Sequence, residues 1–398
     1  MKTKPAVSEK QRLFFIIPSL MRGGAERVLI SLANYFNQLN FETFIVSLNT
    51  NIPAYPIDEG VKVIYILKRD KNFPGHRIFY VLQTFYKLIK LLLEHKPVFV
   101  VSFITSANIW AGITCNITRT PYLVSERTSP NRTVNQFGYF HKRLAALIYK
   151  KSAAVVVSAK GVEDCLLQNE AFKNLDNIYR ITNAVPLFNP VSSEKVHHRK
   201  FILGVGRLAY VKGFDMLIAA YAKAQPDDID LLIIGEGEER ANLICQVYNM
   251  GLREKVILPG SKTNLQDYYS QAEMFVLPSR NEGYPNALVE AMSFGCPCVA
   301  MNCDFGPSEI ITNWHNGVLT PRNSITAMAD AIGRIMIDPE LKAGLGNHAL
   351  NINDTNDADR ILKDWENLIL KQVYKSSKIG KKTNGILTHP KDALVIKP

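Results

Sequence analysis

The sequence predicts an α/β protein of two Rossmann-like domains, each built on a parallel sheet. The chain has 398 residues, which is more than one hydrophobic core usually serves. Both halves alternate short β-branched or aromatic runs with amphipathic helical segments, the pattern of βα units. A break that contains two prolines divides this pattern into two series of similar length. We therefore expect two sheets, with ligands bound at the carboxyl ends of their strands.

The strand-like runs define the two domains. In the first half they are RLFFIIPSL, TFIVSL, VKVIYIL, VFVVSFI, TPYLVSE and AAVVVSA. In the second half they are KFILGVGRL, DLLIIGEG, KVILPG, MFVLPSR, PCVAMN and GVLT. The segment NAVPLFNPVSSEKVHHRK between them predicts a linker at about residues 184–199. We expect an N-terminal domain over residues 1–185 and a C-terminal domain over residues 199–357.

The end of the chain differs from both domains. ADRILKDWENLILKQVY predicts a closing helix over residues 358–375. Residues 376–398 are rich in Lys and have no apolar period, so we expect a disordered basic tail.

Composition and segment patterns exclude several classes. Residues 97–118 are uncharged and long enough to cross a bilayer, but their Ser, Thr and Asn content favours a buried strand, a polar loop and a small helix. The polar start MKTKPAVSEKQR does not resemble a signal peptide, which predicts a protein that begins in the cytosol. The six cysteines form no CxxC pair and have no histidine at zinc-ligand spacing, and we interpret them as free thiols of a reducing compartment.

Charge is distributed unevenly along the chain. Lys and Arg outnumber Asp and Glu by 24 to 12 over residues 1–190, whereas residues 191–375 carry 18 against 23. This asymmetry indicates that the two halves face different partners. Nucleic acid, an anionic membrane surface or a phosphorylated substrate would each suit the basic half.

Two glycine-containing loops follow predicted strands. Gly23 and Gly24 open the helix AERVLISLANYF, where exposed amides favour an anion, although a structural turn explains the pair equally well. The loop GEGEER has Arg240 where a dinucleotide fingerprint requires glycine, and its glutamates would repel a pyrophosphate. We therefore do not expect this loop to bind a nicotinamide or flavin.

Charged residues stand at strand ends in the second half. Arg207 ends a strand and Lys212 lies before the next helix, an arrangement suited to a diphosphate whose charge grows as it leaves. Two solvated surface cations are the alternative. Glu282 and Glu290 lie on either side of a Gly-Tyr-Pro-Asn turn that opens a helix, where carboxylates can accept hydrogen bonds from vicinal hydroxyls. A capped helix with exposed glutamates is the alternative there.

These segments in combination resemble the retaining family-4 glycosyltransferases. EGYPNALVE resembles their E-x7-E motif, GVGRLAYVKGFD their G-R-L-x(3–4)-K-G segment, and IPSLMRGGAERVL their N-terminal Gly-Gly loop. DLLIIGEGEE, KVILPG and CDFGPSEII stand in the family's order, and the resemblance covers about residues 12–375. It implies the GT-B fold, in which two Rossmann-like domains face each other across a cleft and the last helix crosses back to the first domain.

The resemblance also implies roles for individual residues. Arg207 and Lys212 would hold the donor diphosphate and stabilise the leaving nucleoside diphosphate, without a metal or another cofactor. Glu290 would bind the ribose hydroxyls, and Glu282 would hold the transferred sugar, which makes Glu282, Arg207 and Lys212 the expected catalytic residues. The other expected donor contacts are Gly23, Gly24, Gly260, Ser261, Gly283, Tyr284, Ala287 and Leu288.

The expected acceptor is a membrane lipid that carries a glycan. LVSERTSPNR, which contains Glu126 and Arg127, and CDFGPSEII resemble bacterial enzymes that add N-acetylgalactosamine or related hexosamines to undecaprenyl-diphosphate-linked glycans. VSFITSANIW lacks the histidine that many family members place near the donor sugar, and Asn108 is the nearest polar candidate. The resemblance implies transfer of a hexose or an N-acetylhexosamine, with GalNAc from UDP-GalNAc as the best guess. We expect Glu126, Arg127 and Asn108 on the acceptor side.

The helix RIFYVLQTFYKLIKLLLEHK fits a membrane-associated protein. Its apolar stripe is accompanied by the cations Arg77, Lys87 and Lys90, as expected of a helix that rests on anionic lipid. A core-facing helix with a solvated basic side is the alternative. The first interpretation predicts a peripheral location at the cytoplasmic face of the membrane.

Two other functions compete with a glycosyltransferase. A nucleotide-sugar epimerase or a phosphorylase of the same fold would use the same donor residues. A nucleic-acid-binding protein would use the basic half, but the sequence contains no reader motif and no run of cations interleaved with aromatic residues.

Overall fold

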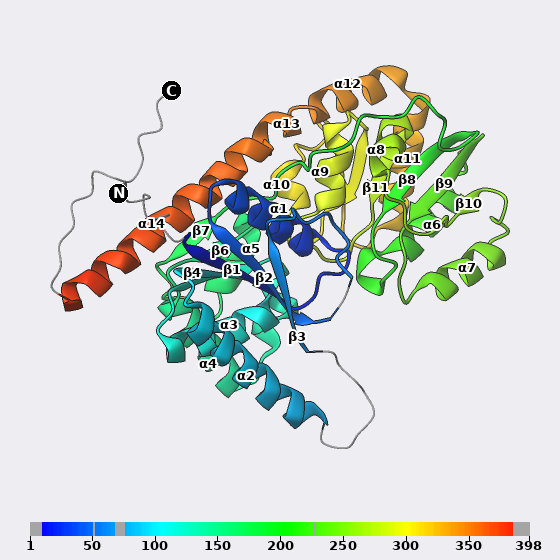
Figure 1. The fold of residues 1–398 in the computed structure, drawn as a ribbon. Helices are drawn as coiled ribbons and strands as arrows, with labels where there is room; N and C mark the ends of the chain where they lie inside the picture. The colour runs from blue at the N-terminus through cyan, green and yellow to red at the C-terminus, as the bar shows by residue number, and fades with distance from the viewer. Residues whose placement is uncertain (1–9, 51, 68–75, 227, 385–398) are drawn as a thin grey trace, which may run out of the picture. The chain divides into compact units, whose positions relative to one another are not determined.

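Two parallel sheets organise the protein, whose computed structural model describes residues 10–50, 52–67, 76–226 and 228–384. The first sheet has seven strands in the order β3-β2-β1-β4-β5-β6-β7, and the second has six in the order β10-β9-β8-β11-β12-β13 (Figure 1). In each sheet the first strand of the series lies inside, with later strands added to both sides. This doubly wound order is that of a Rossmann-like sheet, so the predicted fold class is confirmed.

The strands are short and mostly buried. Those of the first sheet are β1 (Arg12–Ile17), β2 (Glu42–Asn49), β3 (Lys62–Leu67), β4 (Phe99–Phe103), β5 (Tyr122–Glu126), β6 (Val155–Val157) and β7 (Ile178–Arg180). Those of the second are β8 (Lys200–Val205), β9 (Ile229–Ile234), β10 (Val256–Ile257), β11 (Met274–Leu277), β12 (Cys298–Met301) and β13 (Val318–Thr320). Helices on both faces explain why central strands such as β1 are continuous apolar runs.

Helices follow most of the strands in βα order (Figure 1). Five accompany the first series: α1 (Gly24–Gln38), α2 (His76–His95), α3 (Thr105–Thr118), α4 (Tyr139–Lys151) and α5 (Lys160–Leu167). The second series includes α6 (Phe214–Ala224), α7 (Arg240–Asn249), α8 (Leu265–Gln271), α9 (Asn286–Ser293), α10 (Pro307–Ile310), α11 (Ile325–Ile337), α12 (Pro339–Ala349) and α13 (Ile352–Thr355), and α14 (Ala358–Asn384) ends the described chain. Short 3-10 helices occur at Pro130–Arg132 (η1), Val134–Gln136 (η2) and Tyr210–Lys212 (η3).

The core of the second sheet shows the pleat of its strands. Met274 and Val276 pack in one hydrophobic cluster, whereas Phe275 and Leu277 pack in another. Successive side chains of a strand point to opposite faces, so both faces of β11 are buried. This rigid strand ends beside the loop that carries the expected catalytic glutamate.

Contacts group the chain into two compact units. Unit 1 comprises residues 1–124, 151–154 and 362–398, and unit 2 comprises residues 125–150 and 155–361. Within unit 1, Trp365 of α14 is completely buried and stacks on Phe103 with ring centroids 5.6 Å apart. The closing helix therefore returns to elements of the first series, as expected. Residues 181–199, all of which are described, form no helix or strand.

Two elements differ from the prediction. Strand β7 was missed because its three residues, Ile-Tyr-Arg, are too few to show a period. Helix α14 continues past residue 375 to Asn384, because an α-helix satisfies its backbone hydrogen bonds locally and does not require an apolar face in its last turns. The rest of the expected disordered tail, residues 385–398, lies outside the described residues.

The segment over residues 97–118 forms β4 and α3, the expected strand and small helix. Among the described residues no helix has the length and apolar content needed to cross a bilayer.

Candidate active site

The loop after β8 presents Arg207 at the carboxyl end of the second sheet. Two backbone hydrogen bonds hold this loop against the loop after β9: Gly206 N donates to Ile234 O (3.0 Å), and Leu208 N donates to Glu236 O (2.9 Å). Arg207 lies between these two bonds, and its side chain is exposed. The loop therefore fixes the backbone of Arg207 and leaves its guanidinium open to a ligand.

The glycines of the loop after β9 allow this close pairing. A Cβ on Gly235, whose φ is +152°, would lie 1.8 Å from Gly206 O. A Cβ on Gly237 would lie 2.3 Å from Leu208 O. Only glycine fits where two backbones approach so closely. The G-x-G pattern thus has a packing explanation that requires no dinucleotide.

Lys212 is placed by the glycine that follows it. Gly213 has φ +70°, and a Cβ there would lie 2.1 Å from Pro278 O. Arg280 N donates to Val211 O at 2.8 Å. These contacts bring the loop of Lys212 against the loop after β11, which carries the first of the two glutamates.

Lys212 and Glu282 form the centre of the candidate site. Lys212 Nζ donates to Glu282 Oε1 at 2.7 Å, and Ser279 Oγ donates to the same oxygen at 2.6 Å. Glu282 is only 7% exposed. An ammonium group has three N–H donors, so Lys212 can hold Glu282 and a ligand oxygen at the same time. The structure thus joins two residues that the sequence placed in separate motifs.

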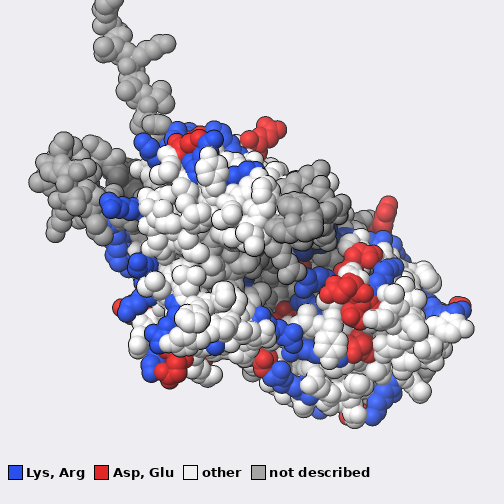
Figure 2. Space-filling view, turned by 90° about the horizontal axis from the view of Figure 1, so that it is seen from below, with Lys and Arg blue, Asp and Glu red and all other residues white. Residues whose placement is uncertain are grey.

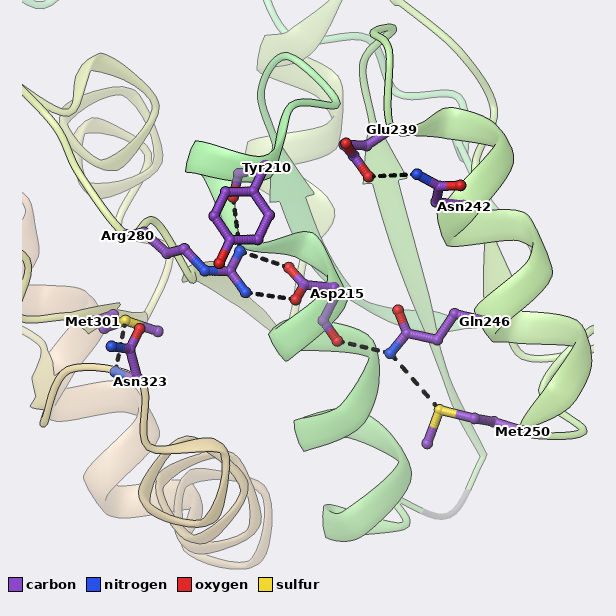
Figure 3. Close-up of polar contacts among 9 residues, drawn as sticks. All are labelled: Tyr210, Asp215, Glu239, Asn242, Gln246, Met250, Arg280, Met301 and Asn323. Carbon is purple, nitrogen blue, oxygen red and sulfur yellow. Dashed lines mark hydrogen bonds and ion pairs between the residues drawn. The ribbon is translucent and has the colours of Figure 1, made fainter. Parts of the chain in front are cut away.

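A bidentate ion pair braces the same two loops (Figure 3). Arg280 donates to both carboxylate oxygens of Asp215, at 2.8 and 2.6 Å, and to Tyr210 O at 2.7 Å. These hydrogen bonds to Asp215 raise the pKa of Arg280. Arg280 and Asp215 were absent from the sequence prediction. Their closeness in sequence was the signal that could have found them, because Asp215 follows Lys212 by three residues and Arg280 precedes Glu282 by two.

Glu290 lies inside helix α9 and is buried. Its Oε2 accepts a hydrogen bond from Tyr269 Oη at 3.0 Å. The amide of Leu288 donates to Pro285 O at 3.0 Å, so a diphosphate at this helix start would compete with Pro285 for that donor. Ala287 is half-buried one residue earlier. The expected roles of these residues toward ribose and diphosphate stay predictions.

Gly283 packs against the chain that follows β5, whereas Tyr284 contacts Asn356. A Cβ on Gly283 would lie 2.5 Å from Arg127 O, so no larger residue fits. The Tyr284 hydroxyl accepts a hydrogen bond from Asn356 Nδ2 at 2.6 Å, and burial raises its pKa to about 12. The ring is therefore engaged elsewhere, which leaves only the backbone of Tyr284 for the expected sugar contact.

An asparagine network connects these loops. Arg127 Nη1 donates to Asn183 Oδ1 at 2.7 Å, and Asn183 Nδ2 donates to Asn286 Oδ1 at 2.7 Å. Asn356 Nδ2 also donates to Asn183 O at 2.6 Å. Burial lowers the pKa of Arg127 to about 9. Arg127, expected on the acceptor side, is thus linked through Asn183 to Asn286 at the start of α9. Nothing in the sequence indicated the two linking asparagines, Asn183 and Asn356.

The two other residues expected on the acceptor side have partners within the protein, and their expected contact with the acceptor stays a prediction. Glu126 and Asn108 are completely buried. Tyr149 Oη donates to Glu126, and Ser102 Oγ donates to Asn108 Oδ1 at 2.7 Å. A buried polar side chain requires such partners, so the structure gives these residues a packing role.

Gly260 and Ser261 follow β10 at the same sheet edge. Gly260 has φ +80°, and its carbonyl accepts a hydrogen bond from Gly235 N at 3.1 Å. Ser261 is exposed. Their expected contact with the nucleotide base stays a prediction.

Gly23 and Gly24 begin helix α1 of unit 1 as expected. Gly23 is the N-cap, and a Cβ there would lie 2.2 Å from Oε2 of Glu26. Glutamate at this third helical position commonly reaches back to the start of its own helix. A carboxylate of the protein therefore lies where an anionic ligand was expected.

Helix α2 supports both interpretations of its sequence. Leu88 and Leu92 are buried, whereas Ile78 and Leu82 are 70% and 62% exposed. Lys87 Nζ donates to Ile66 O at 2.9 Å, and Lys90 forms an ion pair with Glu94 (3.6 Å). The side chain of Arg77 lies outside the described residues. The expected apolar stripe is thus buried at Leu88 and Leu92 and exposed at Ile78 and Leu82.

Family models match both halves of the chain. The model described as Glycosyltransferase Family 4 matches residues 22–187, and the model described as Glycosyl transferases group 1 matches residues 188–351. With the two Rossmann-like sheets, these matches define a glycosyltransferase of the GT-B class. The chain belongs to the family-4 glycosyltransferases, and its second half is a group 1 glycosyl transferase domain.

Two relatives and one solved structure are similar to this chain over nearly their whole length. An uncharacterized glycosyltransferase of Haemophilus influenzae is 28% identical over 89% of this chain and 99% of its own. A Campylobacter jejuni enzyme named N-acetylgalactosamine-N,N'-diacetylbacillosaminyl-diphospho-undecaprenol 4-alpha-N-acetylgalactosaminyltransferase is 28% identical over 89% and 98%. The crystal structure of Anabaena HepE in complex with UDP and glucose is similar in fold, with a TM-score of 0.75, 19% identity and coverage of 91% and 100%.

Proposed function

We propose that the protein is a retaining glycosyltransferase that moves an N-acetylhexosamine from a UDP-sugar to a lipid-linked oligosaccharide. GalNAc is the sugar that we favour. The observation that carries the proposal is the Lys212–Glu282 pair at the carboxyl end of the second sheet, beside exposed Arg207. Two cations can bind a diphosphate, while a buried carboxylate can orient a sugar hydroxyl.

The site residues would act on a leaving group. The bond between C1 of the sugar and the diphosphate oxygen breaks, and an acceptor hydroxyl oxygen bonds to C1 while its proton passes to the departing diphosphate. Negative charge grows on the diphosphate during this step, and Arg207 and Lys212 would stabilise it. Attack from the face on which the diphosphate leaves would retain the configuration.

Relatives support the substrate class. HepE binds UDP and glucose, which favours a UDP-sugar. The Campylobacter relative acts on an undecaprenol-linked glycan and transfers N-acetylgalactosamine, as its name states. A lipid-linked acceptor lies in a membrane, so the enzyme would act at the membrane surface. We therefore propose a peripheral location at the cytoplasmic face of the membrane and a role in bacterial surface-glycan or protein-glycan biosynthesis.

A donor panel tests the proposal. Purified protein would be mixed with UDP- and GDP-sugars and with lipid extract that contains undecaprenyl-diphosphate-linked glycans. We expect UDP release from UDP-GalNAc only when the lipid is present. Release from no nucleotide sugar under any condition would contradict the proposal. Interconversion of the donor without acceptor would favour an epimerase, and release driven by inorganic phosphate would favour a phosphorylase.

Matched variants test the site itself. Glu282→Gln and Lys212→Ala are expected to lower the rate of transfer at least about 100-fold, the usual loss when a preorganised electrostatic contact is removed. Glu340→Gln and Lys223→Ala, at exposed positions outside the site, are the controls and should keep wild-type activity. Wild-type transfer by Glu282→Gln and Lys212→Ala in folded protein would refute the site assignment.

The nucleic-acid alternative receives little support. Lys and Arg lie in separate groups on the face shown in Figure 2, not in one continuous track. A track of cations along a phosphate backbone is the usual footprint of such binding.

A further inference from the structure

Helix α4 leaves a row of large apolar side chains uncovered. Phe140 is 83% exposed, Leu147 51% and Leu144 39%. They recur at positions i, i+4 and i+7, so they form one stripe along the helix. Tyr139 adds a second exposed aromatic ring at the start of the helix. Exposed apolar side chains scattered singly need no explanation, but a continuous stripe indicates a partner.

The opposite side of the helix is firmly packed. Ala145, Ile148 and Tyr149 are buried. The Tyr149 ring contacts Phe172 with centroids 5.5 Å apart, and Asn177 Nδ2 donates to its carbonyl oxygen at 3.0 Å. The helix is therefore held in unit 2 by one face, which leaves the stripe outward.

Cations border the stripe, and acidic residues are absent from it. The helix sequence YFHKRLAALIYKK contains four Lys or Arg residues and neither Asp nor Glu. Among the described residues, none of these four cations takes part in an ion pair; Arg143 instead lies 5.0 Å from the centroid of the Tyr139 ring. The cations at 143, 150 and 151 are exposed, so their charge faces solvent on the same side as the stripe.

We propose that α4 is a docking helix for an anionic lipid bilayer. Apolar and aromatic side chains beside Lys and Arg, without carboxylates, are the pattern of a helix that lies in a membrane interface. A protein partner fits less well, because Lys is depleted at protein–protein interfaces. The biological setting rests on the proposed function, since the acceptor of that reaction would lie in a membrane.

Vesicle binding tests this inference without any enzymatic turnover. The full chain would be floated with vesicles of phosphatidylglycerol and phosphatidylcholine, and with vesicles of phosphatidylcholine alone, at low and high salt. We expect binding to the anionic vesicles that weakens in high salt, because surface charge attraction is screened. The variant Phe140→Ser/Leu147→Ser should bind the anionic vesicles at least about tenfold more weakly than the wild type. The variant Arg143→Glu/Lys150→Glu should bind them up to about 30-fold more weakly.

Controls are available on other exposed positions of unit 2. Ile244→Ser removes an apolar side chain that is 47% exposed. Lys223→Glu/Arg253→Glu changes the net charge by the same amount as the α4 pair, at exposed positions of α6 and the loop after α7. Both should bind vesicles like the wild type. Wild-type binding by the two α4 variants, or no binding by the wild type, would overturn the inference.

Two further measurements separate other outcomes. A concentration-dependent dimer without lipid that the α4 variants abolish would assign the stripe to a second copy of the chain and overturn the inference. Transfer to a detergent-dispersed acceptor should be unchanged in the α4 variants. A protein that binds anionic vesicles through α4 but releases no UDP would refute the proposed function and leave this inference standing.

Discussion

Lys212 meets two groups that would share its ammonium: the carboxylate of Glu282 and the expected diphosphate. The first contact is present in the structure at 2.7 Å. When the diphosphate leaves with more negative charge, Lys212 can strengthen its second contact without moving away from the first. A single side chain would then couple the position of the sugar to the charge on the leaving group. This coupling requires that the loops of Lys212 and Glu282 keep a fixed position relative to each other.

The Arg280–Asp215 ion pair is expected to hold these two loops in place. Arg280→Lys keeps the charge but loses the planar fork that contacts both oxygens of Asp215. We expect transfer to slow about tenfold, because Lys212 and Glu282 lose alignment, while circular dichroism shows a folded protein. Asp215→Asn should have a similar effect.

A double-mutant cycle is the sharper measurement for this pair. Arg280→Lys/Asp215→Asn should be little worse than either single variant, with a coupling energy of about 1 kcal/mol. Additive losses would show that the two residues act independently and would contradict a shared bracing role.

Gly251 is a matched control for a substitution at Gly213. Gly213 and Gly251 have φ of +70° and +69°, but a Cβ on Gly213 would lie 2.1 Å from Pro278 O, whereas nothing lies within 4 Å of one on Gly251. Both alanine variants should lose about 1–2 kcal/mol of folding stability from left-handed strain. Gly213→Ala should lose additional stability because of its contact with Pro278 O, and it alone should lose transfer activity. Urea denaturation measures the stability, and a rate assay measures the activity. Equal stabilities would mean that the loops can move apart without cost.

At the scale of elements, the sequence predicted most strands and helices because apolar period and glycine punctuation are local signals. Strand β7 and the last turns of α14 lacked such signals. The candidate site divides in the same way. Lys212 and Glu282 were identified from loops at strand ends, but their direct contact depends on Gly213 and Pro278, which meet across the fold. The burial of Glu126 was equally invisible, since its partner Tyr149 is far along the chain.

The ion pairs of Glu42 in the first sheet predict how the stability of the protein changes in acid. Lys62 Nζ and Arg12 Nε each donate to the Glu42 carboxylate at 2.6 Å, and these hydrogen bonds hold its pKa below the ordinary 4.5. Because the folded pKa is lower than the unfolded one, the contacts stabilise the protein above the unfolded pKa. That stability is lost as the pH falls through the folded pKa.

Glu42→Gln should therefore be less stable than the wild type at neutral pH, by about 0.5–1 kcal/mol for a partly exposed pair. The difference in free energy of unfolding between the wild type and Glu42→Gln should narrow once the pH falls below 4.5. Urea denaturation over a pH series measures it. A difference that stays constant down to about pH 3 would mean that the charge of Glu42 contributes nothing.

At the scale of the whole molecule, the two ends of the second sheet carry different chemistry. Arg207 follows β8 at its carboxyl end. His197, His198 and Asp230 lie near the amino ends of β8 and β9, and among the described residues they form the one cluster whose ligand-type atoms converge, within 4.8 Å of one another. A metal bound at that cluster would therefore lie at the opposite end of the sheet from the expected diphosphate.

This separation predicts the effect of a chelator. If Arg207 and Lys212 neutralise the diphosphate, EDTA should leave the rate of transfer unchanged, and added Mg²⁺ or Mn²⁺ should not raise it. A thermal melt in the same buffers would show whether chelation acts on folding instead. Loss of activity in EDTA that Mg²⁺ restores, with an unchanged melt, would contradict a donor site that works by side-chain cations alone.

The asparagine network also bears on how this enzyme could acquire a new donor. Asn286 begins helix α9, at the turn expected to hold the donor. Asn183, which holds Asn286, and Asn356, which holds Tyr284, lie far away in sequence. A change at Asn286 alone would leave the Asn183 amide short of a partner, at a cost of about 1–3 kcal/mol. Useful changes of specificity should therefore arise as coupled substitutions. A directed-evolution library that varies residues 284–286 together with 183 and 356 should yield functional variants that one confined to residues 284–286 would miss.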